Sequence, residues 1–265
     1  MRLALGTLLV SLVAALGVSA PAGADPAYPT SPFGDPTGAN DWTCRPTAER
    51  PEPVIIVHGT FGDRKDLLDD LSAAMVAQGF CVFSLDYGNR ATGPIEQSAQ
   101  ELKDFTAKVL AAAGATKVSM VGHSQGGMMP RYYIKNLGGD GLVEDLVGLA
   151  PSNHGTANPG ALASGDSCVS CGQQATGSEF LTALNTPDET PGDVDYTQVV
   201  TTFDEVVVPY TSGFLAADPR STDITLQDRC AGRRPGSRWW RAPRPRRRWS
   251  PPGCSRRRRA SRRGC

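Results

Sequence analysis

The stretch KVSMVGHSQGG, residues 117–127, joins an apolar run to a serine that has glycines on both sides. The apolar run predicts a buried strand over 117–124, and the pattern from 125 to 137 predicts a helix. The five residues GHSQG, 122–126, fit G-x-S-x-G, a pattern that is common by chance. Its place between a buried strand and a helix is typical of a sharp turn that exposes a nucleophilic serine, here Ser124.

The rest of the chain alternates between strand and helix patterns. Apolar, β-branched runs predict further buried strands, and helical periodicity predicts further helices. The strands are expected at 53–59, 81–88, 142–150 and 197–208, and the helices at 66–78 and 95–113. This alternation predicts an α/β domain with a mainly parallel sheet and helices on both faces.

The long segment 158–191 has the composition of a loop. It contains one short amphipathic piece, GSEFLTALN at 177–185. That piece either covers a pocket or packs on the sheet as an ordinary surface helix.

The two ends of the chain differ from its body. Residues 1–24 combine one arginine, an apolar run and a small-residue end, which predicts a signal peptide cleaved near Ala24 rather than a membrane anchor. All 27 acidic residues lie at or before Asp228, whereas 14 of the 27 basic residues, all arginines, fall in 233–265. We therefore expect one folded domain over 25–232, followed by an irregular basic tail.

Five cysteines precede the basic tail, and export would let them form disulfides. Cys44 stands just before one predicted strand and Cys81 opens the next, so these two are candidates for a bridge. Cys168-x-x-Cys171 lacks a second ligand pair at zinc spacing, which favours a structural disulfide over a metal site. The spacing leaves the partner of Cys230 open.

Ester hydrolysis by a serine passes through a tetrahedral oxyanion. Two backbone N–H groups must point at that oxygen, each contributing roughly 3–4 kcal/mol. The N–H of Gln125, directly after the serine, is one expected donor. The segment HGT at 58–60 follows an early buried strand, so we expect the N–H of Thr60 to be the second.

Five segments resemble, in the same order, the secreted bacterial triacylglycerol lipases of the α/β-hydrolase superfamily, and most of all the small disulfide-containing lipases and esterases of actinobacteria. The segments are PVIIVHGTFGD (53–63), GFCVFSLDYG (79–88), VGHSQGGMMPRYYIK (121–135), LAPSNHGT (149–156) and TTFDEVVVPYTSGFL (201–215). The resemblance runs from about Trp42 to Cys230. It implies an α/β-hydrolase fold and a Ser-Asp-His triad in that chain order. It further implies a neutral lipid or other ester as substrate, transient contact with a lipid interface, a monomer, and no metal, other cofactor or nucleic acid.

The resemblance assigns the acid of the triad to Asp204. This residue is expected at the carboxyl end of the strand 197–208, on the side where Ser124 opens. Strand alternation would point Glu205 the other way. Asp218 and Asp223 are weaker candidates in a predicted loop.

The sequence has three histidines, and none follows Asp204. His58 belongs to the predicted oxyanion loop, and His123 is expected to pack beneath the serine turn. His154 precedes the acid, a position that the resemblance implies is structural, so it is a weak candidate for a substitute base. The resemblance places the catalytic histidine after a segment like ITLQDRC, 224–230, in an Asp-His or Glu-His pair.

The chain instead continues as an arginine-rich tail with no acid and no periodicity, so the expected last element of the fold is missing. Arg, Pro, Gly, Ala and Trp are what GC-rich DNA encodes out of frame. Read one base later, codons for residues 233–238 permit Gly-Asp-Pro-Asp-His, which would place the histidine near Ser237. We therefore favour a shifted reading frame over a genuine tail that binds nucleic acid or an anionic surface.

Three functional hypotheses follow from these patterns. The first is a secreted serine ester hydrolase of the lipase type, impaired because its histidine is absent. The second is a short-chain carboxylesterase, since the sequence does not reveal the acyl pocket. The third is a non-catalytic binding protein of the same fold with a basic tail.

Overall fold

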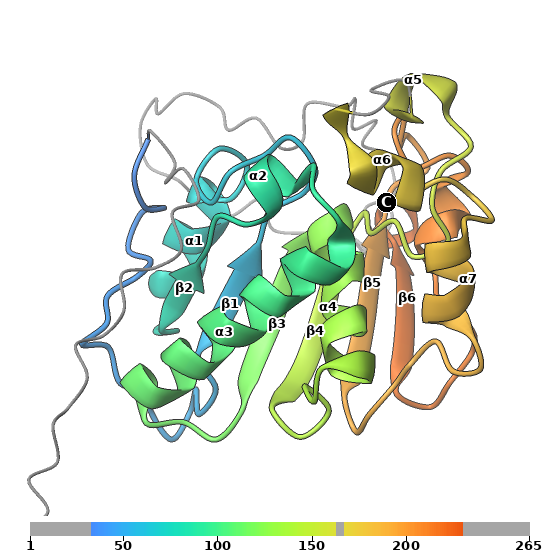
Figure 1. Ribbon diagram of the computed structural model, residues 1–265. Helices are drawn as coiled ribbons and strands as arrows, with labels where there is room; N and C mark the ends of the chain where they lie inside the picture. Colours follow the sequence, from blue (N-terminus) through green and yellow to red (C-terminus); the bar gives the residue numbers. More distant parts are fainter. Residues whose placement is uncertain (1–32, 163–166, 230–265) are drawn as a thin grey trace, which may run out of the picture.

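A computed structural model describes residues 33–162 and 167–229 (Figure 1). The expected signal peptide at 1–24, Cys230 and the basic tail at 233–265 lie outside the described residues. Short strands and helices alternate along the chain. Their order is β1 Val54–Val57, α1 Asp69–Val76, β2 Val82–Ser84, α2 Gly88–Ala91, α3 Ile95–Ala113, β3 Val118–His123, α4 Gln125–Asn136, β4 Val143–Leu149, α5 Pro159–Leu162, α6 Val169–Gln173, α7 Glu179–Asn185, β5 Asp195–Val200, the 3-10 helix η2 Tyr210–Gly213, β6 Ser221–Thr225 and α8 Leu226–Arg229.

The strands of the described region form one sheet in the order β2-β1-β3-β4-β5-β6, and every neighbouring pair is parallel. This confirms the predicted α/β class with a parallel sheet. Because the strands all run in one direction, their carboxyl ends meet at a single edge of the sheet. The loops that follow β1, β3 and β5 therefore converge there, although the strands are far apart in sequence.

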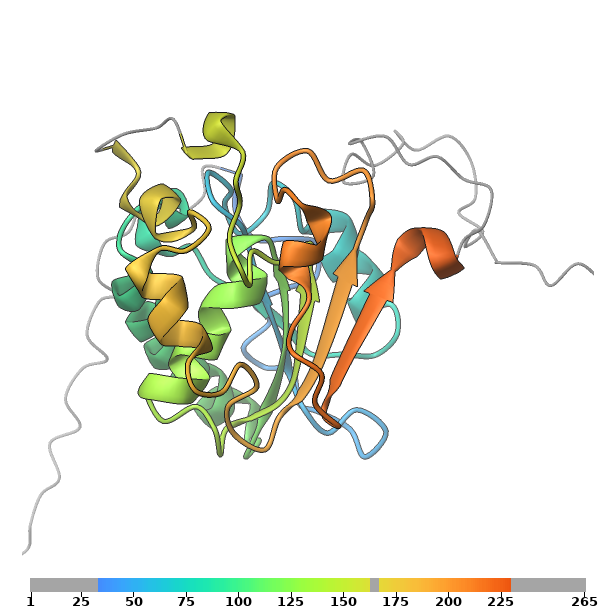
Figure 2. The same cartoon turned by 90° about the vertical axis from the view of Figure 1, so that its right-hand side faces the viewer.

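Helices cover both faces of the sheet (Figures 1 and 2). Helices α3, α4 and α7 lie on one face, over the larger hydrophobic core. Helix α1 lies on the other, where Leu71 and Met75 pack with Val54 and Ile56 of β1. In the described part of the chain, no helix combines the length and the hydropathy that a membrane crossing requires.

Helix α3 matches its predicted bounds, because both of its ends are encoded locally. It begins directly after Pro94 and ends at Gly114, which has a left-handed φ of 68°. Glycine adopts this conformation without strain and so terminates helices well. Leu102 and Val109, which have helical spacing, are fully buried in the core.

The strand predicted at 197–208 is wrong in extent. Strand β5 begins at Asp195 and ends at Val200, and the following valines lie in a loop. Turn chemistry outweighs β-propensity in this loop: the Asp204 carboxylate accepts the N–H groups of Val206 and Val207, and Pro209 follows. Val206 is consequently 56% exposed rather than buried in a sheet.

Other expectations need smaller corrections. The segment 158–191 holds α5 and α6 besides the expected α7 at 179–185, and strand β6 was not predicted at all. Strand β6 reads STDIT, which is too short and polar to show a buried run. Its pairing with β5 makes it a strand, and that is a tertiary effect.

Both expected disulfides are present in the structure. Cys44 is bonded to Cys81, and Cys168 to Cys171. The first joins the segment before β1 to the start of β2. The second holds the beginning of α6. Disulfides persist in oxidising compartments, so both bonds are compatible with an extracellular location.

Replacing Cys44 and Cys81 together by serine should lower the free energy of unfolding by about 3–4 kcal/mol, because the bond closes a loop with a sequence separation of 37 residues. The bond between Cys168 and Cys171 closes a loop with a separation of only three, so replacing both of these cysteines by serine should cost less stability. Urea unfolding followed by circular dichroism measures both. Equal losses would contradict the loop-length argument.

Candidate active site

The turn between β3 and α4 holds Ser124 in a strained backbone conformation. Its φ is 55° and its ψ is −122°, a combination that residues with a side chain rarely adopt. The flanking glycines permit this turn. A Cβ on Gly122 would lie 1.8 Å from the carbonyl oxygen of Gly126, and a Cβ on Gly126 would lie 2.3 Å from the carbonyl oxygens of Val57 and His58. The pattern G-x-S-x-G is thus required by close backbone contacts.

Two backbone N–H groups lie beside this serine. Within the ranges that the structure describes, neither Gln125 N nor Thr60 N donates a hydrogen bond. Gln125 opens helix α4, whose N-terminal dipole favours negative charge at this point. Thr60 follows Gly59, where an added Cβ would lie 2.9 Å from Ser124 Cβ, so the loop after β1 abuts the serine.

A cavity of about 350 Å³ opens at this edge of the sheet. Ser124 and Thr60 line it together with Asp204, so the structure brings three of the expected site residues around one space. Much of the remaining wall is apolar. Phe61, Phe203 and Val206 line the cavity and are also exposed to solvent, by 50%, 41% and 56%.

The acidic candidates occupy different environments. Asp204 Oδ1 accepts two backbone N–H groups at 2.9 Å, while its Oδ2 has no hydrogen-bond partner among the described residues. Glu205 lines the cavity as well; the expectation that it points away is wrong, because the segment is a loop without strand alternation. Asp218 pairs with Arg220, which lowers the pKa of Asp218 through hydrogen bonds. Asp223 belongs to β6, and neither it nor Asp218 lines the cavity.

The three histidines have separate surroundings. His58 is fully buried, donates from Nδ1 to the carbonyl of Gly59, and stacks on Tyr87. The sequence led us to expect His123 beneath the serine turn; its ring is largely enclosed there, and the residue also contributes to the cavity wall. His154 is bonded to Glu189 through Nε2 at 3.0 Å and does not line the cavity. Among the described residues, neither His58 nor His154 is hydrogen-bonded to Ser124 Oγ.

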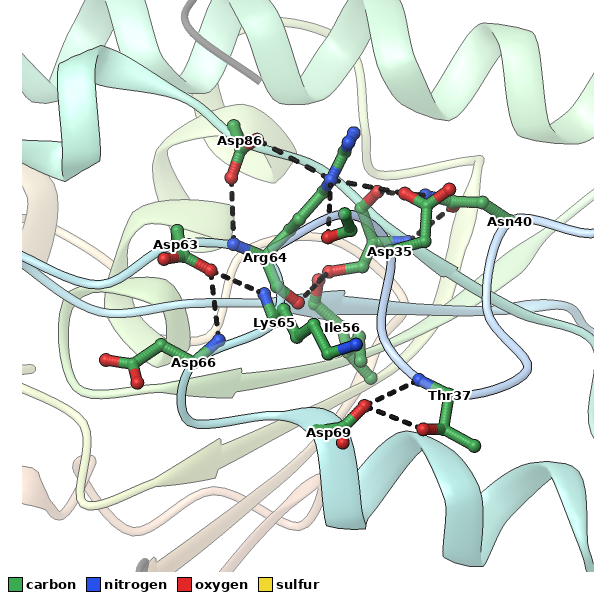
Figure 3. A network of polar contacts seen from close by, with 12 residues as sticks. Asp35, Thr37, Asn40, Ile56, Asp63, Arg64, Lys65, Asp66, Asp69 and Asp86 are labelled. Carbon is green, nitrogen blue, oxygen red and sulfur yellow. Dashed lines mark hydrogen bonds and ion pairs between the residues drawn. The ribbon is translucent and has the colours of Figure 1, made fainter. Parts of the chain in front are cut away.

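Hydrogen bonds and ion pairs hold the loop that follows β1 and carries Thr60 (Figure 3). Asp63 accepts the N–H groups of Lys65 and Asp66 and so closes a turn. The Arg64 side chain lies 3.1 Å from a carboxylate oxygen of Asp35 and 3.6 Å from one of Asp86. Asp86 also accepts the N–H of Arg64. The loop after β1 is therefore tied to both the segment before β1 and the end of β2.

A second strained segment lies next to this loop. Gly88, Asn89, Arg90 and Ala91 all have positive φ between 49° and 60°, so α2 is a left-handed turn. Arg90 O accepts the N–H of Phe61 at 2.8 Å, and Arg90 Nε donates back to Phe61 O at 3.0 Å. Strain of this kind persists where surrounding contacts fix it. Here those contacts hold Phe61 at the wall of the cavity.

Gln174 is a cavity residue that sequence reasoning missed. It follows α6 inside the predicted loop and joins Thr60, Gln125 and Ser152 by side-chain hydrogen bonds. The nearby Cys168-x-x-Cys171 motif indicated local rigidity but gave no reason to expect this position at the cavity.

The buried imidazoles predict a loss of stability in mild acid. Burial lowers the pKa of His58, and burial followed by the proximity of His58 lowers that of His123 to about 4. In the unfolded chain both titrate near 6.5, so between about pH 6.5 and 4 the unfolded state binds protons that the folded state excludes. For His123 alone, the free energy of unfolding should fall by roughly 2–3 kcal/mol between pH 7 and 4.5, and His58 adds to this loss.

Urea unfolding at a series of pH values measures this loss. His123→Asn should reduce the slope of the profile, because it removes an imidazole whose pKa is lowered to about 4. A profile that stays flat in the unmodified chain would contradict the argument.

A parallel sheet with helices on both faces, and a strained serine between the central strand β3 and helix α4, define the α/β-hydrolase class. Sequence comparison then gives the family. The family model Lipase (class 2) matches residues 51–230, and the chain belongs to this family.

Relatives and solved structures agree with that assignment. The chain is 37% identical over 87 residues to a triacylglycerol lipase of Pseudarthrobacter phenanthrenivorans, covering 30% of this chain and 27% of that protein. The chain is also 37% identical over 87 residues to a triacylglycerol lipase of Burkholderia plantarii, which covers 30% of this chain and 24% of that protein. The chain thus matches about a quarter of the length of these relatives.

Two solved structures share the fold. Aspergillus fumigatus lipase B superimposes with a TM-score of 0.60 at 22% identity, over 68% of this chain and 46% of that one. The mature form of Bacillus licheniformis lipase BlEst2 superimposes with a TM-score of 0.55 at 15% identity, over 68% of this chain and 85% of that one. These likenesses support the α/β-hydrolase fold.

Proposed function

We propose that this protein is a serine carboxylic ester hydrolase of the lipase type. The observation that carries the proposal is the geometry at Ser124: a hydroxyl on a strained turn faces a cavity. Beside it stand the N–H groups of Thr60 and Gln125, which have no acceptor among the described residues. This arrangement suits a reaction in which negative charge develops on a carbonyl oxygen.

The residues divide the chemistry as follows. Ser124 Oγ attacks the ester carbonyl carbon, and the oxygen that becomes anionic accepts hydrogen bonds from Thr60 N and Gln125 N. The tetrahedral intermediate expels the alcohol and leaves an acyl group on Ser124, which water then hydrolyses. A base must take the serine proton and return it to the leaving alkoxide. Asp204 would orient that base through Oδ2, its carboxylate oxygen that lacks a partner in the described region.

The base is the missing part of this machinery. The printed sequence has no histidine after Asp204, and His154 is bonded to Glu189 away from the cavity. We infer that the arginine-rich segment at 233–265 is encoded out of frame, and that the histidine of the intact enzyme stands near Ser237. Ser124 without a base keeps its proton and is a weak nucleophile.

The cavity favours an apolar acyl group. Its wall includes Leu162 and Val207, and Phe61 and Phe203 extend the apolar surface to the solvent. A volume of about 350 Å³ lies near the lower end of the usual range of about 300–1,000 Å³ for ligand cavities. We therefore propose neutral esters with short to medium acyl chains as substrates, with triacylglycerols among them. We also propose secretion after removal of residues 1–24, which the two disulfides support.

Covalent labelling tests the proposal on the chain as it exists. A fluorophosphonate should modify the protein slowly, and mass spectrometry of the digest should place the added mass on Ser124. Ser124→Ala should abolish that mass, whereas Ser152→Ala, at another serine that lines the cavity, should leave Ser124 labelled. Absence of label on Ser124 after prolonged incubation would support a non-catalytic binding protein instead.

A further inference from the structure

Gln174 lies between the two residues that supply the proposed oxyanion donors. Its Nε2 is 3.0 Å from Thr60 Oγ1 and 3.2 Å from Gln125 Oε1. Thr60 Oγ1 in turn donates to Gln125 Oε1 at 2.7 Å, so the three side chains form a closed triangle. On its other side, Gln174 Oε1 accepts the hydroxyl of Ser152 at 2.8 Å. With 7% exposure, Gln174 is buried at the cavity wall.

The backbone of Gln174 is fixed from outside this triangle. Its N–H donates to Ser170 O at 3.0 Å, and its carbonyl accepts the N–H of Thr156 at 2.9 Å. Ser170, fully buried, donates its hydroxyl to Ala91 O at 2.6 Å. The disulfide between Cys168 and Cys171 closes the first turn of α6. Gln174 therefore presents its side chain from a rigid, independently anchored position.

Thr60 and Gln125 need such a support. Thr60 lies on the loop after β1, and Gln125 lies at the start of α4, 65 residues later. Their N–H groups act together only if both point at the same oxygen, and a displacement of about 1 Å can cost on the order of 100-fold in rate. A buried hydrogen-bonded network can hold such a geometry, because breaking one bond leaves its partner unsatisfied.

We propose that Gln174 is a positioning residue for the oxyanion hole. Its carboxamide holds the side chains of Thr60 and Gln125 together, and thereby keeps their backbone N–H groups aimed at one point. This inference rests on the proposed function and adds a residue to it. A neutral carboxamide neither attacks the ester nor carries its proton, so Gln174 acts through the two donors rather than on the substrate.

Phosphonylation of Ser124 tests this role in the full chain. The probe is an alkyl p-nitrophenyl phosphonate, with imidazole in the buffer as an external base. Ser124 Oγ forms a bond to phosphorus, p-nitrophenolate leaves, and the serine proton passes to imidazole. Gln174→Met, which keeps the length but removes the side-chain hydrogen bonds, should lower the maximal labelling rate roughly tenfold. The probe concentration at half-maximal rate should change less than twofold, because probe binding precedes the charge development.

Gln173→Met is the matched control. Gln173 precedes Gln174 and is the last residue of α6. Its side chain accepts a hydrogen bond from Ile95 N and donates one to Glu96, so it does not join the network of Gln174. That variant should label at the unmodified rate. Gln174→Asn, too short to reach Thr60, provides a second test should the Met variant fold poorly, and urea unfolding checks both.

The outcomes separate the two proposals. If the unmodified chain takes no label on Ser124, the proposed function itself fails. If the unmodified chain is labelled on Ser124 and Gln174→Met is labelled at the same maximal rate, Gln174 has no positioning role. An equal slowing in Gln173→Met and Gln174→Met would overturn the inference in favour of a general loosening of α6.

Discussion

Restoring the proposed reading frame after Cys230 should raise the rate of hydrolysis of a short p-nitrophenyl ester on the order of 10⁴-fold above that of the given chain. In the proposed frame, an Asp-His pair would be encoded near residue 237. The imidazole would accept the proton of Ser124 and pass it to the leaving group. In the given chain, the N–H groups of Thr60 and Gln125 would still stabilise an oxyanion under the proposed function, but the attacking oxygen would remain protonated. Residual turnover from such a site is on the order of 10³–10⁴ over water.

Two further variants of the restored chain make this result specific. Replacing the regained histidine by glutamine should return the rate to that of the printed chain. Asp204→Asn should lower it strongly as well, since an amide cannot stabilise the imidazolium. Initial rates at matched concentrations of folded protein give the comparison. Equal rates for the printed and restored chains would refute both the assigned base and the shifted frame.

Gly122→Ala will lower the free energy of unfolding by at least about 3–5 kcal/mol, or prevent folding altogether. The added methyl group would lie 1.8 Å from the carbonyl oxygen of Gly126 and 2.2 Å from its carbonyl carbon. Both are backbone atoms at the start of α4, so no side-chain rotation relieves the contact. The turn would have to open, and this would displace Ser124.

Gly141→Ala is the matched control for that substitution. A Cβ at Gly141 meets no atom within 4 Å, and its backbone is not in the left-handed region. Its unfolding free energy should stay within about 0.5 kcal/mol of the unmodified chain in urea titrations. Similar stability of the Gly122 and Gly141 variants would contradict the account of the serine turn.

The sequence was most informative where local rules coincide with the tertiary structure. Helix α3 has both ends encoded, by Pro94 and Gly114, and strand β3 is a buried run that leads into a glycine-flanked turn. The prediction of one strand over 197–208 was wrong, because β5 ends at Val200 and residues 204–208 form a loop. A run of valines has high β-propensity, but the Asp204 carboxylate and Pro209 favour a turn, and the sheet ends before it.

Cavity residues divide in the same way. The positions of Ser124 and Thr60 at the cavity and of Gln125 at the start of α4 could be predicted, because each lies in a short motif next to a strand. Their catalytic roles stay predictions. Gln174 could not be predicted, since its role depends on contacts with residues 49 and 114 positions away. The exposure of Phe61 beside the cavity also depends on a distant contact, the left-handed turn at Arg90.

By itself, the sequence determined the parallel α/β sheet, the exposed serine turn and the absence of a histidine after Asp204. These depend on residue identity and on spacing within a few turns of chain. Tertiary structure alone decided which distant side chains meet at the carboxyl edge of the sheet, how Asp204 is turned, and how Gln174 joins the two halves of the site. Such contacts follow from parallel strands bringing remote loops together, which no local pattern encodes.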